Sequence, residues 1–262
     1  MREAEFVTDP TFYALAVPVV LLVGVSKGGF GGGAGMIAVP ALSFAVPLPQ
    51  AAAILLPILC AMDLVAVHAF RGRHSVPHTR LLLPGAVLGI AAGAFAFGSF
   101  DERWLRVAVG AIAVIFTLHW LWSRRNRSAS ISRAEPESNK ASLSAGTFWG
   151  LLAGFTSTLA HAGGPPVSIF LLPQRLPPAL YVGTTVIVFT VINYVKLIPY
   201  AWLGQLRSDN LVTSLILLPL APLGVRLGRW LHDRIDETLF YRLVYGLLLV
   251  TGLKLMSEAV VG

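Results

Sequence analysis

Long apolar stretches separated by short polar turns dominate the chain. They cover roughly 11–26, 33–70, 81–100, 104–122, 146–172, 179–203, 211–231 and 238–256. Many are close to the ~20 residues that an α-helix needs to cross about 30 Å of hydrocarbon. They lack the alternation of β-barrel strands and are rich in Leu, Ala, Val and Gly. The pattern predicts an all-α polytopic membrane protein with about eight to ten membrane segments.

Two glycine-rich stretches interrupt these runs about half a chain apart. The first is 26–35 (SKGGFGGGAG), and the second is 156–166 (TSTLAHAGGPP). Unpaired backbone amides cost several kcal/mol each in lipid, so such a break persists only where protein buries it or where it lines a cavity. A matched pair of broken segments in the two halves of a membrane chain is typical of a transporter's binding site.

Composition supports the membrane assignment. The chain is 55% hydrophobic and 13% charged, whereas soluble domains carry about 25% charge. A net charge of +7 is compatible with an anionic partner such as nucleic acid, but no nucleic-acid motif accompanies it, and basic residues that orient helices explain it better. The N-terminus lacks the basic region of a cleaved signal peptide, so we expect the first span to remain.

Cysteine and metal-ligand patterns bound the chemistry further. Cys60 is the only cysteine, so the chain has no disulfide framework and no CxxC metal site. We therefore expect no cofactor and no metal. The expected partners are the lipid bilayer and a small anionic substrate, with no nucleic acid, and a homodimer stays open.

A polar stretch, 123–145, divides the chain into two related halves, 1–122 and 146–262. Gly24 and Gly33 lie 130 positions before Gly154 and Gly163. A second set of matches, offset by 135 positions, relates Pro84, Gly89, Gly93 and Asp101 to Pro219, Gly224, Gly228 and Asp236. The order of these matches indicates an internal duplication. Small residues at four-residue spacing, as at Gly85, Gly89 and Gly93, are predicted to let helix backbones pack closely.

Loop charge predicts that the second half is inverted. In the first half the basic loop contains Arg71, Arg73 and Arg80, while the next loop, at 101–103, is balanced. In the second half the richly basic segment falls at the other loop, with Arg226, Arg229, Arg234 and Arg242. The positive-inside rule then places the linker in the cytoplasm and both termini in the periplasm. Alternatively, Arg226 and Arg229 belong to the membrane end of a helix.

Inversion requires an odd number of crossings per half, and five segments per half fit best. The second segment of each half, 33–46 or about 164–172, is too short to span comfortably and is predicted to be a broken or re-entrant half-helix. A helix that restarts after Gly33 or Gly164 presents free N–H groups and the positive end of its dipole. Two such ends facing each other near the midplane would bind a small anion.

Polar side chains gather at both breaks, where close packing alone would need only glycine. The predicted substrate-binding residues are Ser26, Lys27, Gly28, Gly29, Gly31, Gly32, Gly33, Thr156, Ser157, Thr158, His161, Gly163 and Gly164. The alternative is that the glycines serve only tight packing, with Lys27 snorkelling to the interface. His161 can exchange a proton near neutral pH or act as a packing residue.

Further polar residues within apolar runs are candidates for coupling or gating. Asp63 and Asn193 occupy matching positions, 130 apart, and an acid within a span is a functional candidate by default. Lys196 lies one helical turn from Asn193, and with His161 it completes the predicted coupling group. The alternatives are an interfacial ion pair of Asp63 with His68 or Arg71, and a snorkelling Lys196.

Residues 24–40 (GVSKGGFGGGAGMIAVP) resemble the signature of the TauE/SafE sulfite exporter family, also called the 4-toluene sulfonate uptake permease family. Residues 157–166 (STLAHAGGPP) look like the second-repeat motif of one branch, although they depart from its fuller Gly-x-Gly-Gly-Gly pattern. The resemblance covers nearly the whole chain. It implies a multi-pass carrier of the bacterial inner membrane for sulfite, sulfonates or related organic anions.

Three functional hypotheses follow. The first is a secondary transporter that moves a small sulfur-containing anion by alternating access. The second is a channel or carrier in which Asp63 is the coupling or selectivity group. The third, an intramembrane enzyme using His161 with Ser157 or Asp63, lacks metal-ligand spacing and paired carboxylates, so we expect no enzyme.

Overall fold

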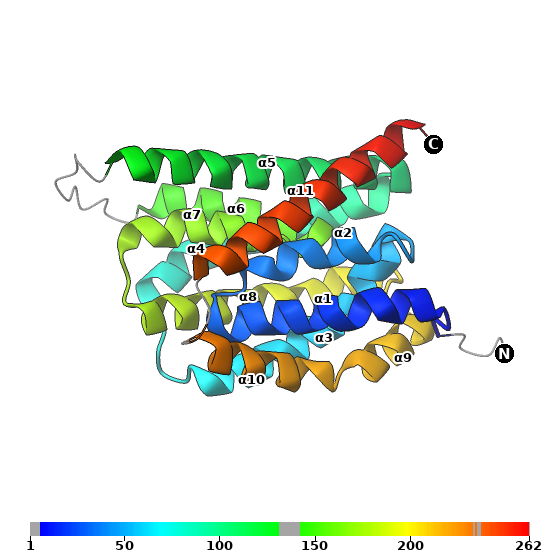
Figure 1. Ribbon diagram of the computed structural model, residues 1–262, viewed down its shortest axis with the longest axis horizontal. Coiled ribbons are helices and arrows are strands. Elements are labelled where there is room, and N and C mark those ends of the chain that lie inside the picture. The colour runs from blue at the N-terminus through cyan, green and yellow to red at the C-terminus, as the bar shows by residue number, and fades with distance from the viewer. Residues whose placement is uncertain (1–5, 131–141, 233, 235–236, 262) are drawn as a thin grey trace.

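The structure, a computed structural model, is all-helical in the residues it describes, which are 6–130, 142–232, 234 and 237–261. Its long helices run side by side along the longest axis of the molecule (Figure 1). The prediction of an all-α architecture is confirmed.

Helices of the first half are α1 (Pro10–Gly29), η1 (Gly33–Ile37), α2 (Ala38–Leu42), α3 (Leu48–Ala69), α4 (Val76–Ser99) and α5 (Glu102–Ser130). Those of the second half are α6 (Leu143–Ala160), α7 (Gly164–Leu171), η2 (Leu172–Gln174), α8 (Pro178–Trp202), α9 (Ser208–Leu217), α10 (Leu220–His232) and α11 (Glu237–Val261). Several begin with proline in the first turn, where its missing N–H has no partner to lose. Asp9 caps α1 by accepting from the Thr11 amide at 2.9 Å.

Six helical segments of the described chain are long and apolar enough to cross a bilayer. They are Pro10–Gly29, Leu48–Ala69, Val76–Ser99, Glu102–Ser123, Pro178–Trp202 and Ser208–Leu231. The short segments predicted at 33–46 and 164–172 fold as η1 with α2 and as α7. Whether they are re-entrant, and whether the membrane segments number eight to ten, stays a prediction.

Two element boundaries add to the sequence interpretation. Helix α5 continues through Ser130, into the stretch predicted as a linker, because arginines in this region favour helix; most of the rest of 123–145 lies outside the described residues. At Pro219, α9 gives way to α10, since proline has no N–H to donate to the preceding turn. Arg226 and Arg229 lie within α10 rather than in a loop.

Four helix pairs form the framework: α1 with α10, α4 with α6, α5 with α11, and α3 with α8. Glycines bring the backbones of the first two pairs together. A Cβ at Gly89 would lie 2.0 Å from the Leu151 carbonyl oxygen, and one at Gly24 would lie 2.8 Å from the Gly224 Cα. The predicted packing role of this glycine spacing is confirmed.

Candidate functional site

The two glycine-rich breaks lie against each other in the interior. A Cβ at Gly164 would lie 2.9 Å from the Gly33 Cα and 3.6 Å from the Gly32 carbonyl oxygen. Both η1 and α7 begin at this contact. The fold therefore brings the starts of the two short helices together, and Gly33 and Gly164 are both buried.

Equivalent turns end α1 and α6 just before the breaks. The Gly32 amide donates to the Ser26 carbonyl at 3.0 Å, and the Ala162 amide donates to the Thr156 carbonyl at 3.2 Å. Donors and acceptors are both 130 positions apart, which is the offset of the sequence repeat. The same hydrogen bond therefore closes the corresponding helix in each half.

Each turn contains a residue in the left-handed backbone conformation. Gly31 has φ +72° and Gly32 has φ +78°, whereas the position equivalent to Gly31 is His161, with φ +52°. A left-handed conformation costs a residue with a Cβ roughly 1–2 kcal/mol. Strain of this kind persists only where the surroundings hold the side chain, and it is concentrated at functional sites.

The hydroxyl groups at the breaks are used locally. Ser26 Oγ accepts from the Ala34 amide at 2.9 Å, which satisfies a donor in the first turn of η1. Thr156 Oγ1 donates to the Ala162 carbonyl at 3.0 Å, whereas Thr158 Oγ1 donates to Gly154 within its own helix. Ser26 and Thr156 therefore brace the breaks, and Thr158 braces α6.

Packing accounts for several of the predicted binding glycines. A Cβ at Gly28 would lie 2.1 Å from the Val225 carbonyl oxygen of α10, and one at Gly163 would lie 2.9 Å from the Ala153 carbonyl oxygen. Gly29 instead lines a surface pocket at the end of α1. The packing alternative thus has direct support at Gly28 and Gly163.

A buried ion pair links α1, α3 and α8. Lys27 Nζ lies 2.5 Å from Asp63 Oδ1 and donates to the Leu59 carbonyl at 3.2 Å. Asn193 Nδ2 donates to Asp63 Oδ2 at 2.7 Å. Lys27 is 5% exposed and Asp63 is fully buried. The ionic partner of Asp63 is therefore Lys27 rather than His68 or Arg71, and the snorkelling alternative for Lys27 is wrong.

A second buried cluster surrounds Lys196, one turn after Asn193 on α8. Lys196 Nζ contacts the Ser157 carbonyl at 3.0 Å, Ser157 Oγ at 3.0 Å and His161 Nδ1 at 2.7 Å. His161 Nε2 lies 3.0 Å from the Ala52 carbonyl oxygen. Lys196 is fully buried, so it does not snorkel either.

These contacts fix the imidazole tautomer. The Ala52 carbonyl oxygen can only accept, so Nε2 of His161 carries the hydrogen and Nδ1 is the acceptor. Lys196 then donates all three ammonium hydrogens to neutral acceptors. A neutral imidazole thus bridges the Lys196 cation to α3, and these bonds hold the left-handed His161 in place.

The charges in this interior do not balance. Among the described residues, the buried lysine, arginine and carboxylate side chains are Lys27, Asp63 and Lys196. Lys27 and Asp63 neutralise each other, which leaves Lys196 without a carboxylate partner in the described part of the chain. A buried cation of this kind favours an anion nearby. No trio of potential metal ligands occurs among the described residues.

Sequence reasoning missed Tyr200, which donates to the Thr158 carbonyl at 2.7 Å and is fully buried. Its position four residues after Lys196 was an available signal, since it places both side chains on one face of α8. The Ala52 and Leu59 carbonyls carry no signal in sequence, because any residue type supplies one.

The family profile named Sulfite exporter TauE/SafE matches residues 16–255. The chain belongs to this family. The resemblance inferred from the glycine-rich motifs is confirmed, and the family's description is that of an exporter rather than an enzyme. No solved structure matches the chain.

Two relatives are similar over part of their length. A Cupriavidus necator protein described as "Probable sulfite/organosulfonate exporter TauE" is 29% identical over 117 residues, which are 44% of this chain and 46% of that protein. The similar region thus spans about half of that relative. A Comamonas testosteroni protein described as "Probable inner membrane transporter protein TsaS" is 29% identical over 180 residues, which are 68% of this chain and 70% of that protein.

Proposed function

We propose that this TauE/SafE chain is a secondary transporter of a small sulfur-containing anion, such as sulfite, a sulfonate or a related organosulfonate, in a bacterial inner membrane. The printed descriptions of the two relatives support the substrate class and the membrane. The observation that carries the proposal is the fully buried ammonium of Lys196, bonded only to neutral acceptors in the described chain.

The proposed site lies where the two breaks meet. An anion there would balance the charge of Lys196 by taking one ammonium hydrogen from a present acceptor, with the hydroxyl of Ser157 as a second donor. The N-terminus of α7, at Gly164 and beside Gly33, adds the positive end of a helix dipole. Sulfite and sulfonate oxygens are strong acceptors of this kind of donor.

We further propose that the halves are inverted repeats with cytoplasmic linker and periplasmic termini. The helix contacts support this, because each first helix packs on the opposite half: α1 packs on α10 of the second half, and its counterpart α6 packs on α4 of the first half. The basic segments also support this arrangement, since Arg73 of the first half and Arg229 of the second line one pocket. The loops that follow α4 and α8 also start close together, since a Cβ at Gly98 of α4 would contact the side chain of Leu203, which follows α8.

Alternating access is the mechanism that this arrangement supports. Lys27, Asp63, His161 and Lys196 are at most 6% exposed, so an anion reaches them only when one half moves against the other. Asp63 and Asn193 join the two halves directly, and rearrangement of these contacts, together with Lys196 and His161, would couple substrate binding to the movement.

A channel or carrier that selects by Asp63 is the second candidate. In its favour, a carboxylate within a span is a common ion site. Both carboxylate oxygens are already engaged by Lys27 and Asn193, so a transported cation would have to displace the Lys27 ammonium.

Flux into proteoliposomes tests the proposal. Sulfite, methanesulfonate, benzenesulfonate and acetate as a carboxylate control would be offered to wild-type protein and to Lys196→Gln. We expect saturable flux of at least one sulfur anion, and a loss of about tenfold or more in Lys196→Gln, because a bond to a charged group contributes roughly 1.5–3 kcal/mol. Lys254→Gln, at a mostly exposed lysine, is the matched control.

Two results would contradict the proposal. One is no flux of any sulfur anion by wild-type protein, and the other is equal flux by wild type and Lys196→Gln. Cation flux that Asp63→Asn abolishes would favour the second candidate instead.

A further inference from the structure

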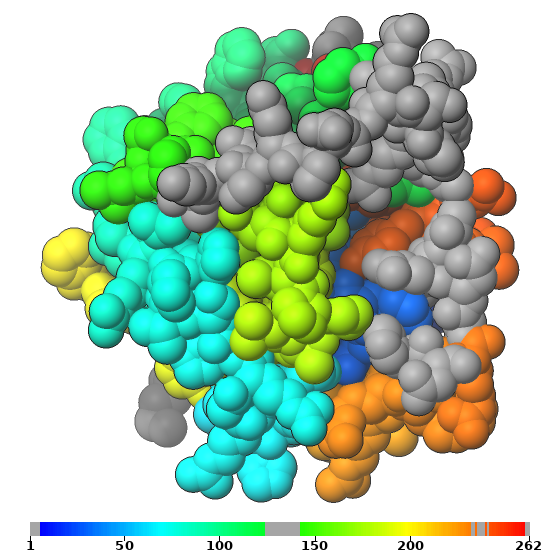
Figure 2. All heavy atoms as spheres, turned by 90° about the vertical axis from the view of Figure 1, so that its left-hand side faces the viewer, coloured from blue at the N-terminus to red at the C-terminus, as the bar shows by residue number. Residues whose placement is uncertain are grey.

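A pocket of about 400 Å³ opens where α1 and α3 end and α8 begins. Its walls come from both halves of the chain. In the space-filling view the end of α1 lies at the bottom of a depression, between α10 in orange and the yellow-green segment before α8 (Figure 2). The pocket is much larger than a sulfite ion needs.

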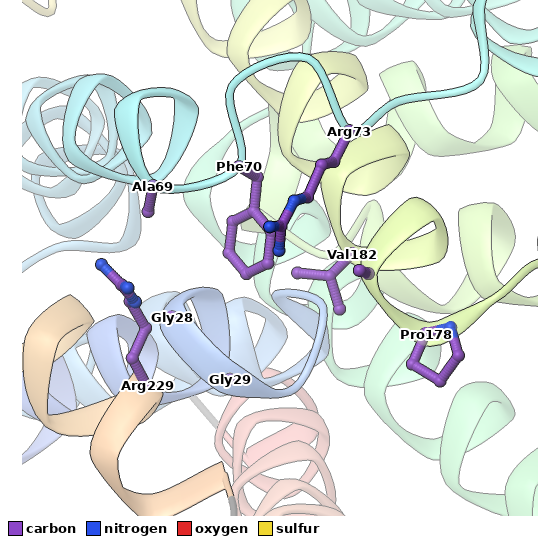
Figure 3. Close-up of a pocket in the computed structure, with 9 residues that line it drawn as sticks. Gly28, Gly29, Ala69, Phe70, Arg73, Pro178, Val182 and Arg229 are labelled. Carbon is purple, nitrogen blue, oxygen red and sulfur yellow. The ribbon is translucent and has the colours of Figure 1, made fainter.

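Two arginines from different halves face this pocket. Arg73 follows α3, and its side chain lies beside Phe70, whereas Arg229 lies on α10 and its side chain extends toward Ala69 at the end of α3 (Figure 3). Both arginines are exposed, and neither forms an ion pair with a carboxylate in the part of the chain that the structure describes. Both guanidinium groups therefore lie at the pocket surface, where a ligand that enters would meet them.

The backbone holds Arg73 in position. A Cβ at Gly183 would lie 1.5 Å from the Arg73 carbonyl oxygen, so α8 packs directly on this residue. The Arg73 amide donates to the Phe70 carbonyl at 3.0 Å, and the Ser75 amide donates to Thr184 Oγ1 at 2.9 Å. The loop is thus tied at both sides of the arginine.

Arg229 is fixed in the same way from the other half. Its neighbour Gly228 packs on α1, where a Cβ would lie 2.2 Å from the Val25 carbonyl oxygen. Two arginines on tightly packed backbones lose less freedom on binding an oxyanion than arginines on mobile loops would.

The pocket adjoins the part of α1 that carries the buried Lys27. Gly28 and Gly29 form its floor, and the next residue inward along α1 is Lys27, the partner of Asp63. The ring of Phe70 and the side chain of Val182 add an apolar wall. Oxyanion donors beside an apolar wall match a group that carries a charged head and a carbon substituent.

We propose that this pocket is a second anion site, a vestibule in which Arg73 and Arg229 bind the sulfonate head of an organosulfonate while Phe70 and Val182 contact its carbon substituent. The proposal rests on the proposed function and adds an access site to it. Arginine recognises sulfonate and phosphate oxygens by the same forked hydrogen bonds, so an anionic phospholipid headgroup shares this chemistry, and the test separates the two sources.

The experiment compares Arg73→Gln and Arg229→Gln with Arg71→Gln and Arg226→Gln, which change exposed arginines outside the pocket. Flux of methanesulfonate and benzenesulfonate is measured against concentration in phosphatidylcholine vesicles, with substrate on the pocket side. We expect KM to rise roughly tenfold in the two pocket variants with kcat within about twofold, because a charged mouth concentrates substrate. The controls should change KM by less than about twofold.

A further variant tests the apolar wall. Phe70→Ala should raise KM for benzenesulfonate more than for methanesulfonate, because only the larger substituent reaches the ring. Equal effects on both substrates would contradict this part of the proposal.

Four outcomes would overturn the vestibule. Unchanged KM in the pocket variants removes it and leaves the proposed function intact, provided that wild type transports sulfonates. Equal shifts in the control variants indicate general surface charge instead. A shift that appears only when phosphatidylglycerol is added identifies a lipid-headgroup site. No wild-type flux of any sulfonate refutes the proposed function and the vestibule with it.

Discussion

The carboxylate of Asp63 accepts a hydrogen bond from the side-chain amide of Asn193, 130 positions away, at 2.7 Å. The two residues occupy corresponding places in α3 and α8, one of two pairs of corresponding helices that pack on each other, the other being α5 with α11. The second carboxylate oxygen is held by Lys27. The same carboxylate of Asp63 therefore takes part both in the hydrogen bond that joins the halves and in the buried ion pair with Lys27.

Removing the carboxylate should unfold part of this junction. We expect Asp63→Asn to destabilise the protein by about 3–5 kcal/mol, since it leaves the ammonium of Lys27 buried without its counter-charge. The double variant Lys27→Met with Asp63→Asn should be more stable than Asp63→Asn alone. Denaturant unfolding in detergent measures both. Destabilisations that simply add in the double variant would show that the two side chains are not coupled.

Side-specific labelling tests the proposed inversion. The one natural cysteine, Cys60, is buried, so single introduced cysteines report their own position. A membrane-impermeant maleimide should label Arg71→Cys and Arg234→Cys from one side, and Asp101→Cys and Arg207→Cys from the opposite side. Parallel repeats would instead place Arg71 and Arg207 on the same side, because they follow corresponding helices.

Glycine substitutions separate packing from open space. Gly28→Ala should destabilise the protein by about 1–3 kcal/mol, because its new methyl group would meet the Val225 carbonyl. Gly246→Ala on α11 is the matched control, since a Cβ there has no neighbour within 4 Å. It should leave stability unchanged or raise it by up to about 1 kcal/mol through helix propensity. Similar melting temperatures for the two variants would contradict the close α1–α10 contact.

Backbone strain at His161 gives a fourth prediction. Both His161→Gly and His161→Ala lose the bonds to Lys196 and Ala52, but only glycine accepts φ +52° freely. The glycine variant should therefore be more stable than the alanine variant by about 1 kcal/mol. Gly72→Ala isolates the same strain where no neighbour lies within 4 Å, and should cost a similar amount. Equal stability of the two His161 variants would argue against the left-handed conformation.

Hydrophobic periodicity and glycine placement were sufficient to predict the helical architecture, the positions of both breaks and the close backbone packing at the glycine stripes, although not which helices pair. They were sufficient because span length and backbone approach are set by local sequence. The partner of Asp63 was not predictable in this way. Several basic residues lie within reach along the chain, and the rotation of α1 against α3 selects Lys27.

The pocket at the end of α1 was hidden for a related reason. In sequence Arg73 and Arg229 mark only topology, since their separation along the chain gives no sign that the two halves bring them to one pocket. Tyr200 was overlooked although its spacing from Lys196 was visible. The sequence therefore allows one to predict which side chains share a face of one helix, but not which side chains of different helices meet.

Under the proposed duplication, the meeting of Asp63 with Asn193 also restricts how the two copies could diverge. Identical copies would have set two carboxylates, or two amides, against one another at this junction. Two carboxylates would repel, and two amides would leave Lys27 without a counterion. This junction therefore needs an acid from one copy and an amide from the other, so the two gene segments would no longer be interchangeable here.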